Sequence, residues 1–254
     1  MDIEVLKFGG SSLASADELR KVANVLLARR GQRRVVVCSA MGGVTNDLIN
    51  IGLRASRGDE SFRLSIAALE ERHLHVAREL AIAQVDDNLN SPLQSIELLP
   101  DELQNRLNEL KALCDGLFLI GELSAKSMDQ LVSYGERMAV PLVSAWLKAN
   151  GLRVRRVDAR DWIQTDQNYG AAEVSREETG QSILEGVTSD LNFEILITEG
   201  FIGKCVEGYT TTLGRGGSDY TASLIASAVE AKCMEKSTDV PGMLTADPRI
   251  VEHA

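Results

Sequence analysis

The sequence predicts an α/β fold, a three-layer αβα sandwich with a mostly parallel central sheet. Short, partly β-branched runs alternate with segments of helical periodicity from the first residues onward. A glycine-rich turn follows three of the predicted strands, and each turn precedes a predicted helix. Parallel strands need crossover helices, and this alternation is the pattern that such a sheet produces.

Two strand–turn–helix units open the chain. Ser15 and Glu18 form a capping box at the start of the first helix, and Arg29, Arg30 and Gly31 suit its C-terminal end. The predicted elements are a strand at 3–8, a glycine turn at 9–12, a helix that Ser15 caps, a strand at 34–38, a glycine turn at 41–43 and a helix at 44–55.

The middle of the chain is predicted to be helical. Residues 59–123 are rich in Leu, Glu and Arg at helical spacing, with a break at 90–92. We expect two or three helices there, and an antiparallel hairpin is one arrangement of them. The helical pattern continues over 124–150. Since the chain has no repeat, low-complexity tract or obvious linker, we interpret 1–254 as one domain with a helical excursion at about 59–133.

Strands and helices alternate again in the second half of the chain. The turn at Glu207-Gly208 predicts a hairpin, and the glycines of the third loop precede another helix. The predicted elements are a strand at 152–157, a helix at 176–187, a strand at 193–198, a hairpin at 204–212, a glycine loop at 213–219, a helix at 220–231 and a strand at 233–238.

Composition and charge exclude several classes of function. The chain of 254 residues carries 27 Lys and Arg against 37 Asp and Glu, a formal net charge of −10. This balance argues against nucleic acid or an anionic membrane as a partner, because both require a basic surface. Its apolar runs are shorter than the roughly 18–20 residues of a membrane span. We therefore expect a cytoplasmic protein.

Cysteine and histidine spacing gives no indication of a metal site. Cys38, Cys114, Cys205 and Cys233 are far apart with no CxxC pair, which predicts reduced thiols that lie mostly in the core. The histidines His73 and His75 are two residues apart on a predicted helix. They point about 200° apart and cannot share a metal ion. We expect both at the surface or between helices.

The glycine loops favour an anion-binding site. In an open α/β sheet such loops meet at the carboxyl ends of the strands, where backbone N–H groups and helix N-termini attract phosphate. The sequence has no GxxxxGK[ST] motif, and Asp219 stands where the third glycine of GxGxxG would be, so a dinucleotide fold is disfavoured. It has no GxSxG motif of a serine hydrolase either.

Five motifs identify a family resemblance. The motifs are KFGGSS at 7–12, SAMGGVTN at 39–46, YGER at 134–137, TLGRGGSDYTA at 212–222 and TDVPGMLTADPR at 238–249. They closely resemble the motifs of aspartokinase, of the amino-acid kinase superfamily, in the order that this family has. The resemblance implies the amino-acid kinase fold and phosphoryl transfer from MgATP to the side-chain carboxylate of aspartate. That reaction opens lysine, threonine and methionine biosynthesis.

The resemblance also implies roles for individual residues. Lys7 matches the lysine that contacts the transferred phosphoryl group, and Asp219 matches an acid near the phosphate and metal that organises Lys7. Arg215 pairs with the substrate α-carboxylate, and Glu136 accepts its ammonium group. The implied substrate-binding residues are Ser39, Thr45, Glu136, Phe201, Arg215 and Ser218. The implied nucleotide-binding residues are Lys7, Gly9, Gly10, Ser11, Thr238, Asp239, Leu244 and Arg249.

The chain departs from the family at two nucleotide-side positions. Ser237 replaces an aromatic residue and Leu244 replaces a tyrosine that many aspartokinases have. The aliphatic Leu244 and the long helical excursion suit the bifunctional branch, in which the kinase is fused to homoserine dehydrogenase. The family continues beyond residue 249 with a helix, another lysine and regulatory domains, so we expect this chain to be part of a longer polypeptide. The family also implies a homodimer, with ATP and Mg²⁺ as cofactors.

The chemistry is consistent with these roles. A carboxylate nucleophile is already anionic at neutral pH and needs no general base, so the site must supply positive charge and positioning. Two alternatives remain open. One is a kinase for another acidic amino acid, and the other is a catalytically weak regulatory or assembly module that keeps the kinase fold.

Overall fold

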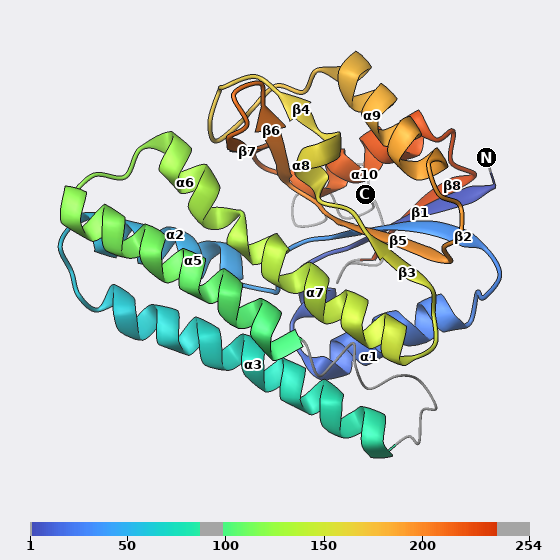
Figure 1. Ribbon diagram of the computed structural model, residues 1–254, viewed down its shortest axis with the longest axis horizontal. Coiled ribbons are helices and arrows are strands. Elements are labelled where there is room, and N and C mark those ends of the chain that lie inside the picture. The colour runs from blue at the N-terminus through green and yellow to red at the C-terminus, as the bar shows by residue number, and fades with distance from the viewer. Residues whose placement is uncertain (1, 87–98, 238–254) are drawn as a thin grey trace, which may run out of the picture.

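The predicted parallel sheet is confirmed by the computed structural model, which describes residues 2–86 and 99–237. Five strands lie in the order β3-β5-β2-β1-β8, and every neighbouring pair is parallel (Figure 1). Their bounds are β1 (Ile3–Phe8), β2 (Arg33–Cys38), β3 (Val154–Arg156), β5 (Ile195–Glu199) and β8 (Cys233–Ser237). The carboxyl ends of β1, β2, β5 and β8 therefore lie along one edge of the sheet.

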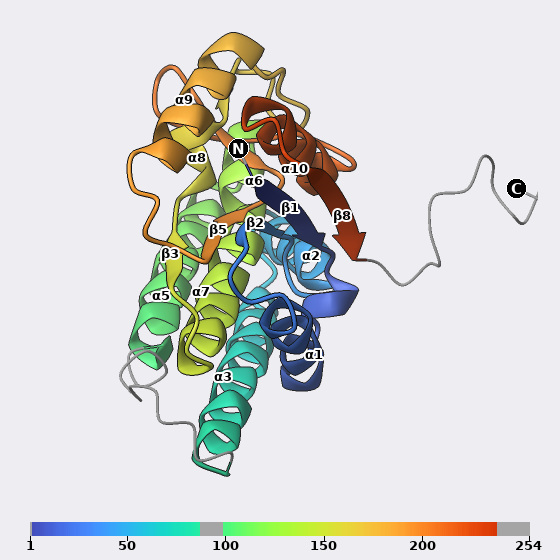
Figure 2. The ribbon, with the colours of Figure 1, turned by 90° about the vertical axis from the view of Figure 1, so that its right-hand side faces the viewer.

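Helices cover both faces of this sheet, and each face has its own apolar core. Leu6 and Phe8 of β1 lie in the larger core, which helices α1 (Ala16–Leu27) and α7 (Tyr134–Ala149) share. Val5, one residue away, lies in the second core. Helices α8 (Ala159–Trp162), α9 (Arg176–Thr188) and α10 (Gly217–Ala228) cover that second face (Figure 2). The alternation of β1 side chains between the two faces confirms the three-layer prediction.

Helices occupy the described part of the predicted excursion at about 59–133. They are α3 (Phe62–Asp86), α5 (Leu99–Ile120) and α6 (Ala125–Val132), and α2 (Val44–Ser56) precedes them. Ion pairs join Arg63 to Asp115 and Glu70 to Lys111, so early residues of α3 face late residues of α5. The two helices are therefore antiparallel.

Three local predictions have definite outcomes. The Ser15 hydroxyl accepts a hydrogen bond from the Glu18 N–H at 3.4 Å, which confirms the N-cap of α1. His73 is fully buried and its Nδ1 contacts the Leu69 carbonyl at 2.8 Å, whereas His75 is exposed. Three of the four cysteines are buried, and Cys233 is half-buried. Among the described helices, none combines the length and apolar character needed to cross a membrane.

A small second sheet lies beside the carboxyl ends of the central strands. It contains β4 (Gln164–Thr165), β6 (Ile202–Cys205) and β7 (Thr210–Thr212), and β6 with β7 forms the predicted hairpin. Helix α8 and strand β4 are not predicted from the sequence. The sequence also predicts the start of α10 at residue 220, but the helix begins at Gly217, because Gly216 takes a left-handed conformation (φ +77°) at the N-cap. This correction brings Ser218 and Asp219 into the first turn of α10.

Candidate active site

One cavity brings together most of the residues that sequence analysis singled out. It has a volume of about 360 Å³ and lies at the carboxyl ends of β1, β2 and β5. The predicted residues that line it are Lys7, Gly10, Ser39, Thr45, Glu136, Phe201, Arg215, Ser218 and Asp219. Ser11 lines a neighbouring cavity of about 390 Å³ together with Phe8, Ser12 and Ser237. Thr238, Asp239, Leu244 and Arg249 lie outside the described residues.

The first two glycine loops touch through their backbones. The Gly42 N–H donates to the Gly10 carbonyl at 2.9 Å, and a Cβ on Gly10 would lie 2.9 Å from the Ala40 carbonyl oxygen. Only glycine fits this approach without displacing backbone. The Gly9 N–H donates to the carbonyl of Ser237 at 3.3 Å, so this amide is already used within the fold.

Lys7 and Asp219 form an ion pair at one end of the cavity. Their Nζ and Oδ1 atoms are 2.9 Å apart, although 212 residues separate them in the chain (219 − 7). Lys236, which sequence analysis missed, lies 2.7 Å from the other oxygen of Asp219. Burial alone would raise the pKa of Asp219, but its hydrogen bonds and charge interactions with Lys236 and Lys7 together hold it below its usual value. The carboxylate is therefore ionised and shared between two ammonium groups.

The position of Lys236 follows from strand register. Lys236 in β8 pairs with Lys7 in the neighbouring parallel strand β1, so both side chains lie on the α10 face of the sheet. Sequence analysis placed both strands but not their register. Alternation along the strand 233–238, aligned with 3–8, is the signal that could have found this residue.

Glu136 is a further charged residue that lines the cavity. It is almost fully buried at the start of α7, and its Oε1 accepts a hydrogen bond from the Ala40 N–H at 3.0 Å. Its Oε2 is buried and has no hydrogen-bond partner among the residues that the structure describes. Burial raises the pKa of Glu136 to about 8. A cationic ligand in the cavity would satisfy this oxygen and favour the ionised form.

A second buried carboxylate, Glu199, lies close to Glu136. It ends β5 and accepts a hydrogen bond from the Ala159 N–H at 2.9 Å. Burial raises the pKa of Glu199 to about 7, and its negative charge adds to the increase at Glu136. Sequence analysis did not select this residue, because its role depends on contacts that sequence spacing does not reveal.

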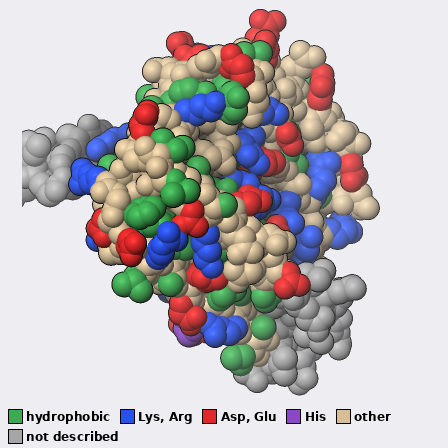
Figure 3. Space-filling view, turned by 60° about the vertical axis from the view of Figure 1, so that its left-hand side comes forward, with side chains coloured by type: hydrophobic (Ala, Val, Ile, Leu, Met, Phe, Trp, Pro, Cys, Tyr) green, Lys and Arg blue, Asp and Glu red, His purple; other side chains and the backbone are tan. Residues whose placement is uncertain are grey.

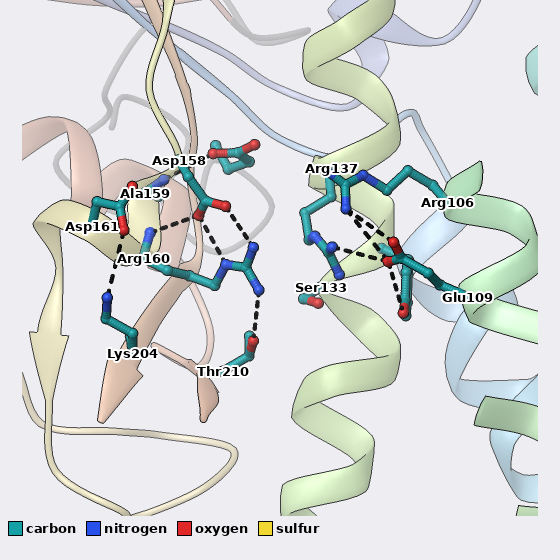
Figure 4. Close-up of polar contacts among 12 residues, drawn as sticks. Arg106, Glu109, Ser133, Arg137, Asp158, Ala159, Arg160, Asp161, Lys204 and Thr210 are labelled. Atoms are coloured by element: carbon teal, nitrogen blue, oxygen red, sulfur yellow. Dashed lines mark hydrogen bonds and ion pairs between the residues drawn. The ribbon is translucent and has the colours of Figure 1, made fainter. Parts of the chain in front are cut away.

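Other charged residues near the site form contacts between neighbouring helices and strands (Figure 4). Arg137 follows Glu136 in α7 but contacts Glu109 of α5 at 3.2 Å. On the other side, Arg160 pairs with Asp158 and donates to the hydroxyl of Thr210 in β7 at 3.2 Å. These contacts fix α7 against α5 and α8 against β7, and they leave Glu136 as the charged member of the YGER motif that faces the cavity.

Arg215 extends from the loop between β7 and α10. It is exposed, and no hydrogen bond or ion pair within the described part of the chain holds its guanidinium group. The backbone beside it is well anchored, since the Leu213 N–H donates to the Phe201 carbonyl at 2.9 Å. Phe201 itself has a left-handed backbone (φ +69°), and its N–H donates to the Thr221 hydroxyl at 3.2 Å.

The cavity therefore combines cations and anions at separate places. Lys7 and Lys236 flank Asp219, Glu136 offers a buried carboxylate, and Arg215 projects from the third glycine loop. Such an arrangement suits a ligand with both anionic and cationic groups. On the face drawn in Figure 3, acidic and basic side chains are interspersed. Within 2–86 and 99–237, no group of three His, Cys, Asp or Glu side chains is placed to hold a metal ion.

Comparison with known proteins agrees with this geometry. The sequence profile described as "Amino acid kinase family" matches residues 2–254. The chain belongs to the amino acid kinase family. Within this family it is 32% identical to lysine-sensitive aspartokinase 3 of Escherichia coli, over 100% of the chain and 52% of that protein. It is 34% identical to the chloroplastic aspartokinase 1 of Arabidopsis thaliana, over 98% of the chain and 42% of that protein.

A solved amino acid kinase structure has the same architecture. The structure of E. coli aspartokinase III in complex with aspartate and ADP (R-state) matches with a TM-score of 0.84 and 32% identity, over 98% of this chain and 52% of that one. These matches confirm the predicted fold class and the resemblance to aspartokinases. The chain spans about half the length of the relatives that it matches.

Proposed function

We propose that this chain carries the site at which ATP phosphorylates the side-chain carboxylate of L-aspartate, the first step of lysine, threonine and methionine biosynthesis. One observation carries the proposal. Glu136, with a buried and unpartnered carboxylate oxygen, and Arg215, with an unpaired guanidinium among the described residues, line the same cavity as the Lys7–Asp219 pair. The cavity therefore offers an acceptor for an α-ammonium group, a donor for an α-carboxylate and a cation for a phosphoryl group.

The proposed reaction requires little from the protein beyond charge and position. A side-chain carboxylate oxygen of aspartate attacks the γ-phosphorus of ATP, a new P–O bond forms, the bond to the β,γ-bridging oxygen breaks, and ADP leaves. No proton has to be removed from the nucleophile. Lys7, held by Asp219, would stabilise the charge on the transferred phosphoryl group. Arg215 and Glu136 would orient aspartate by its two ends, with the guanidinium fork suited to a carboxylate.

Magnesium would enter this site with the nucleotide. Mg²⁺ in kinases keeps several waters and is held by phosphate oxygens and one or two carboxylates. Asp219 is the carboxylate nearest to Lys7 in the cavity, and both of its oxygens face ammonium groups. This chain therefore fits a metal held mainly by the phosphates, with Asp219 at its margin. The metal would neutralise charge on the phosphates, while Lys7 and Asp219 position the groups that react.

A hydroxylamine trap tests the function directly. Aspartyl phosphate reacts with hydroxylamine to give a hydroxamate, which is measured by its colour with ferric iron. We expect hydroxamate formation that requires both ATP and aspartate and that falls at least about a hundredfold in Lys7→Ala. Equal turnover of glutamate would instead indicate a kinase for another acidic amino acid. ATP binding without turnover of any acidic amino acid in the full-length protein would indicate a regulatory or assembly module.

Assembly and location belong to the same proposal. We propose a homodimer in the cytoplasm, as the resemblance to aspartokinases implies, with regulatory domains or a fused enzyme in the longer protein. Sedimentation velocity of the full-length protein tests the dimer, since a monomer at micromolar concentration would contradict it.

A further inference from the structure

Asp129 in α6 is a buried carboxylate that the proposed chemistry does not use. It is 1% exposed, and no cation lies within ion-pair distance of it among the described residues. Three hydrogen bonds satisfy it instead. Its Oδ2 accepts from the Gly170 N–H at 3.0 Å and from the Thr212 N–H at 2.8 Å, and its Oδ1 accepts from the Thr212 hydroxyl at 2.8 Å. A buried charge is tolerated when its lone pairs are filled in this way.

These three bonds hold the base of the loop that carries Arg215. Thr212 ends β7, only three residues before Arg215, and its carbonyl also accepts from the Ala172 N–H at 2.8 Å. The segment around Gly170 packs against the loop as well, because a Cβ on Gly214 would lie 3.3 Å from the Gly170 carbonyl oxygen. Asp129 thus ties both segments next to Arg215 to helix α6. The Arg215 side chain has no partner of its own within the described chain, so this backbone sets its position.

The same pair of helices also carries Glu136. Asp129 and Glu136 are seven residues apart, and α6 and α7 are separated by Ser133 alone. The two carboxylates therefore lie on consecutive helices that meet at Ser133. Asp129 reaches the Arg215 loop, and Glu136 reaches the Ala40 N–H at the cavity.

We infer that Asp129 is a positioning residue that sets the distance between Arg215 and Glu136, and thereby the fit of the α-carboxylate and α-ammonium groups of the amino-acid substrate. The inference rests on the proposed function, because it assigns those two groups to Arg215 and Glu136. The inferred role predicts different effects on the binding of the amino acid and of the nucleotide. Asp129 contacts neither Lys7 nor the first glycine loop, so loss of its bonds affects the amino acid and leaves the nucleotide in place.

Asp129→Ala and Asp129→Asn are expected to differ in how much of the hydrogen-bond network they keep. Asp129→Ala removes all three bonds and leaves the Thr212 and Gly170 amides unpaired. In Asp129→Asn, the amide oxygen can accept from both backbone N–H groups, and the amide NH₂ can donate to the Thr212 hydroxyl, which turns from donor to acceptor. The network is thereby kept although the charge is lost. Asp161→Ala is the matched control, because this carboxylate in α8 is exposed and pairs with Lys204 at 3.5 Å.

The experiment measures steady-state kinetics for both substrates in the full-length protein. We expect Asp129→Ala to raise KM for aspartate at least about tenfold, with KM for ATP within about twofold of wild type. Asp129→Asn and Asp161→Ala should stay within about threefold for both substrates. Equal increases in both KM values, or an Asp129→Asn variant as impaired as Asp129→Ala, would overturn the inference.

Hydrogen exchange measured by mass spectrometry separates this inference from the proposed function. Asp129→Ala should speed exchange in peptides that cover 168–172 and 210–216, and leave peptides of β1 and β2 unchanged. Faster exchange at 210–216 in a protein that does not phosphorylate aspartate would overturn the proposed function and the role of Asp129 in substrate binding. It would still support the hydrogen bonds of Asp129 as the contacts that hold the Arg215 loop. Unchanged exchange at 210–216 would show that Asp129 does not hold the Arg215 loop, whatever the protein phosphorylates.

Discussion

Lys7 and Lys236, paired across the β1–β8 register, hold opposite oxygens of a single carboxylate. The distances to Asp219 are 2.9 Å and 2.7 Å. Two ammonium groups share one negative charge, and the first turn of α10 adds the positive end of a helix dipole. Together, Lys7, Lys236 and Asp219 therefore keep a net positive charge even though Asp219 is ionised.

Substitution of Lys236 should weaken nucleotide binding. Lys236→Met removes one of the two cations while it keeps the length of the side chain, so we expect KM for ATP to rise about three- to tenfold, with KM for aspartate little changed. The measurement is steady-state kinetics at two salt concentrations, with the larger effect at low salt. Lys232→Met is the control. Lys232 lies just before the amino end of β8, is exposed and is 4.0 Å from Asp2. A Lys236→Met enzyme with unchanged KM for ATP would show that this lysine pairs with Asp219 but does not contribute to nucleotide binding.

Aspartate binding should depend on the ionisation of Glu136. Because burial raises the pKa of Glu136 to about 8, the carboxyl is mainly protonated at pH 6 to 7 and loses its proton as the pH rises past 8. We therefore expect kcat/KM for aspartate to increase between pH 6 and pH 9. Glu199→Gln removes a like charge, so it should move the midpoint of this profile to lower pH. A midpoint that stays in place in Glu199→Gln would show that the two groups do not interact.

The same carboxyl should make the ligand-free fold less stable at high pH. The pKa of Glu136 is raised on folding, so its contribution to stability is fully present below the unfolded pKa, near pH 4, and is lost as the pH rises through about 8. Glu136→Gln removes this loss. We expect the variant to have a higher Tm than wild type at pH 8.5 and a similar one at pH 5, by differential scanning fluorimetry. It should also lose most of its affinity for aspartate. A wild-type advantage at pH 8.5 would contradict the burial argument.

Neighbouring glycines in the first loop should differ in their tolerance of alanine. A Cβ at Gly10 would lie 2.9 Å from the Ala40 carbonyl oxygen, so Gly10→Ala must displace backbone, and we expect it to cost about 1–3 kcal/mol of unfolding free energy. At Gly9 the nearest atoms are 3.5 Å away, which is ordinary contact, so Gly9→Ala should change the unfolding free energy by less than about 1 kcal/mol. Urea denaturation of both variants measures the difference. Equal losses would show that the two loops can move apart.

The sequence predicted the elements whose residues carry their own signal. The buried strands β2 and β5 are predicted within one or two residues of their bounds because each contains a short run rich in β-branched residues. Elements α8 and β4 were missed because four and two residues are too short to show a period. In the candidate site, motif residues such as Arg215 were found from local spacing, and they line the cavity.

Residues outside those motifs could not be predicted in the same way. Lys236 depends on the register between strands, and Glu199 on the approach of the α8 N-terminus to β5. Asp129 depends on three hydrogen bonds to segments 41 and 83 residues away along the chain. These positions become visible only when distant segments are brought together. The contacts among the partly buried charged residues of the site therefore depend mostly on residues that are distant along the chain.

The place of β1 in the sheet has a consequence for biosynthesis. Among the described strands this one is made first, yet one of its two neighbours is β8, the last of them to leave the ribosome. Until β8 and α10 are made, one edge of β1 stays open and Lys7 has no counterion. The Lys7–Asp219–Lys236 contacts therefore form only after the 229 residues that follow Lys7, up to Lys236 (236 − 7), have been synthesised, and long-range pairing of this kind is slow. Ligands that bridge Lys7 and α10 should hold the first and last strands together, and so protect a newly made chain from unfolding.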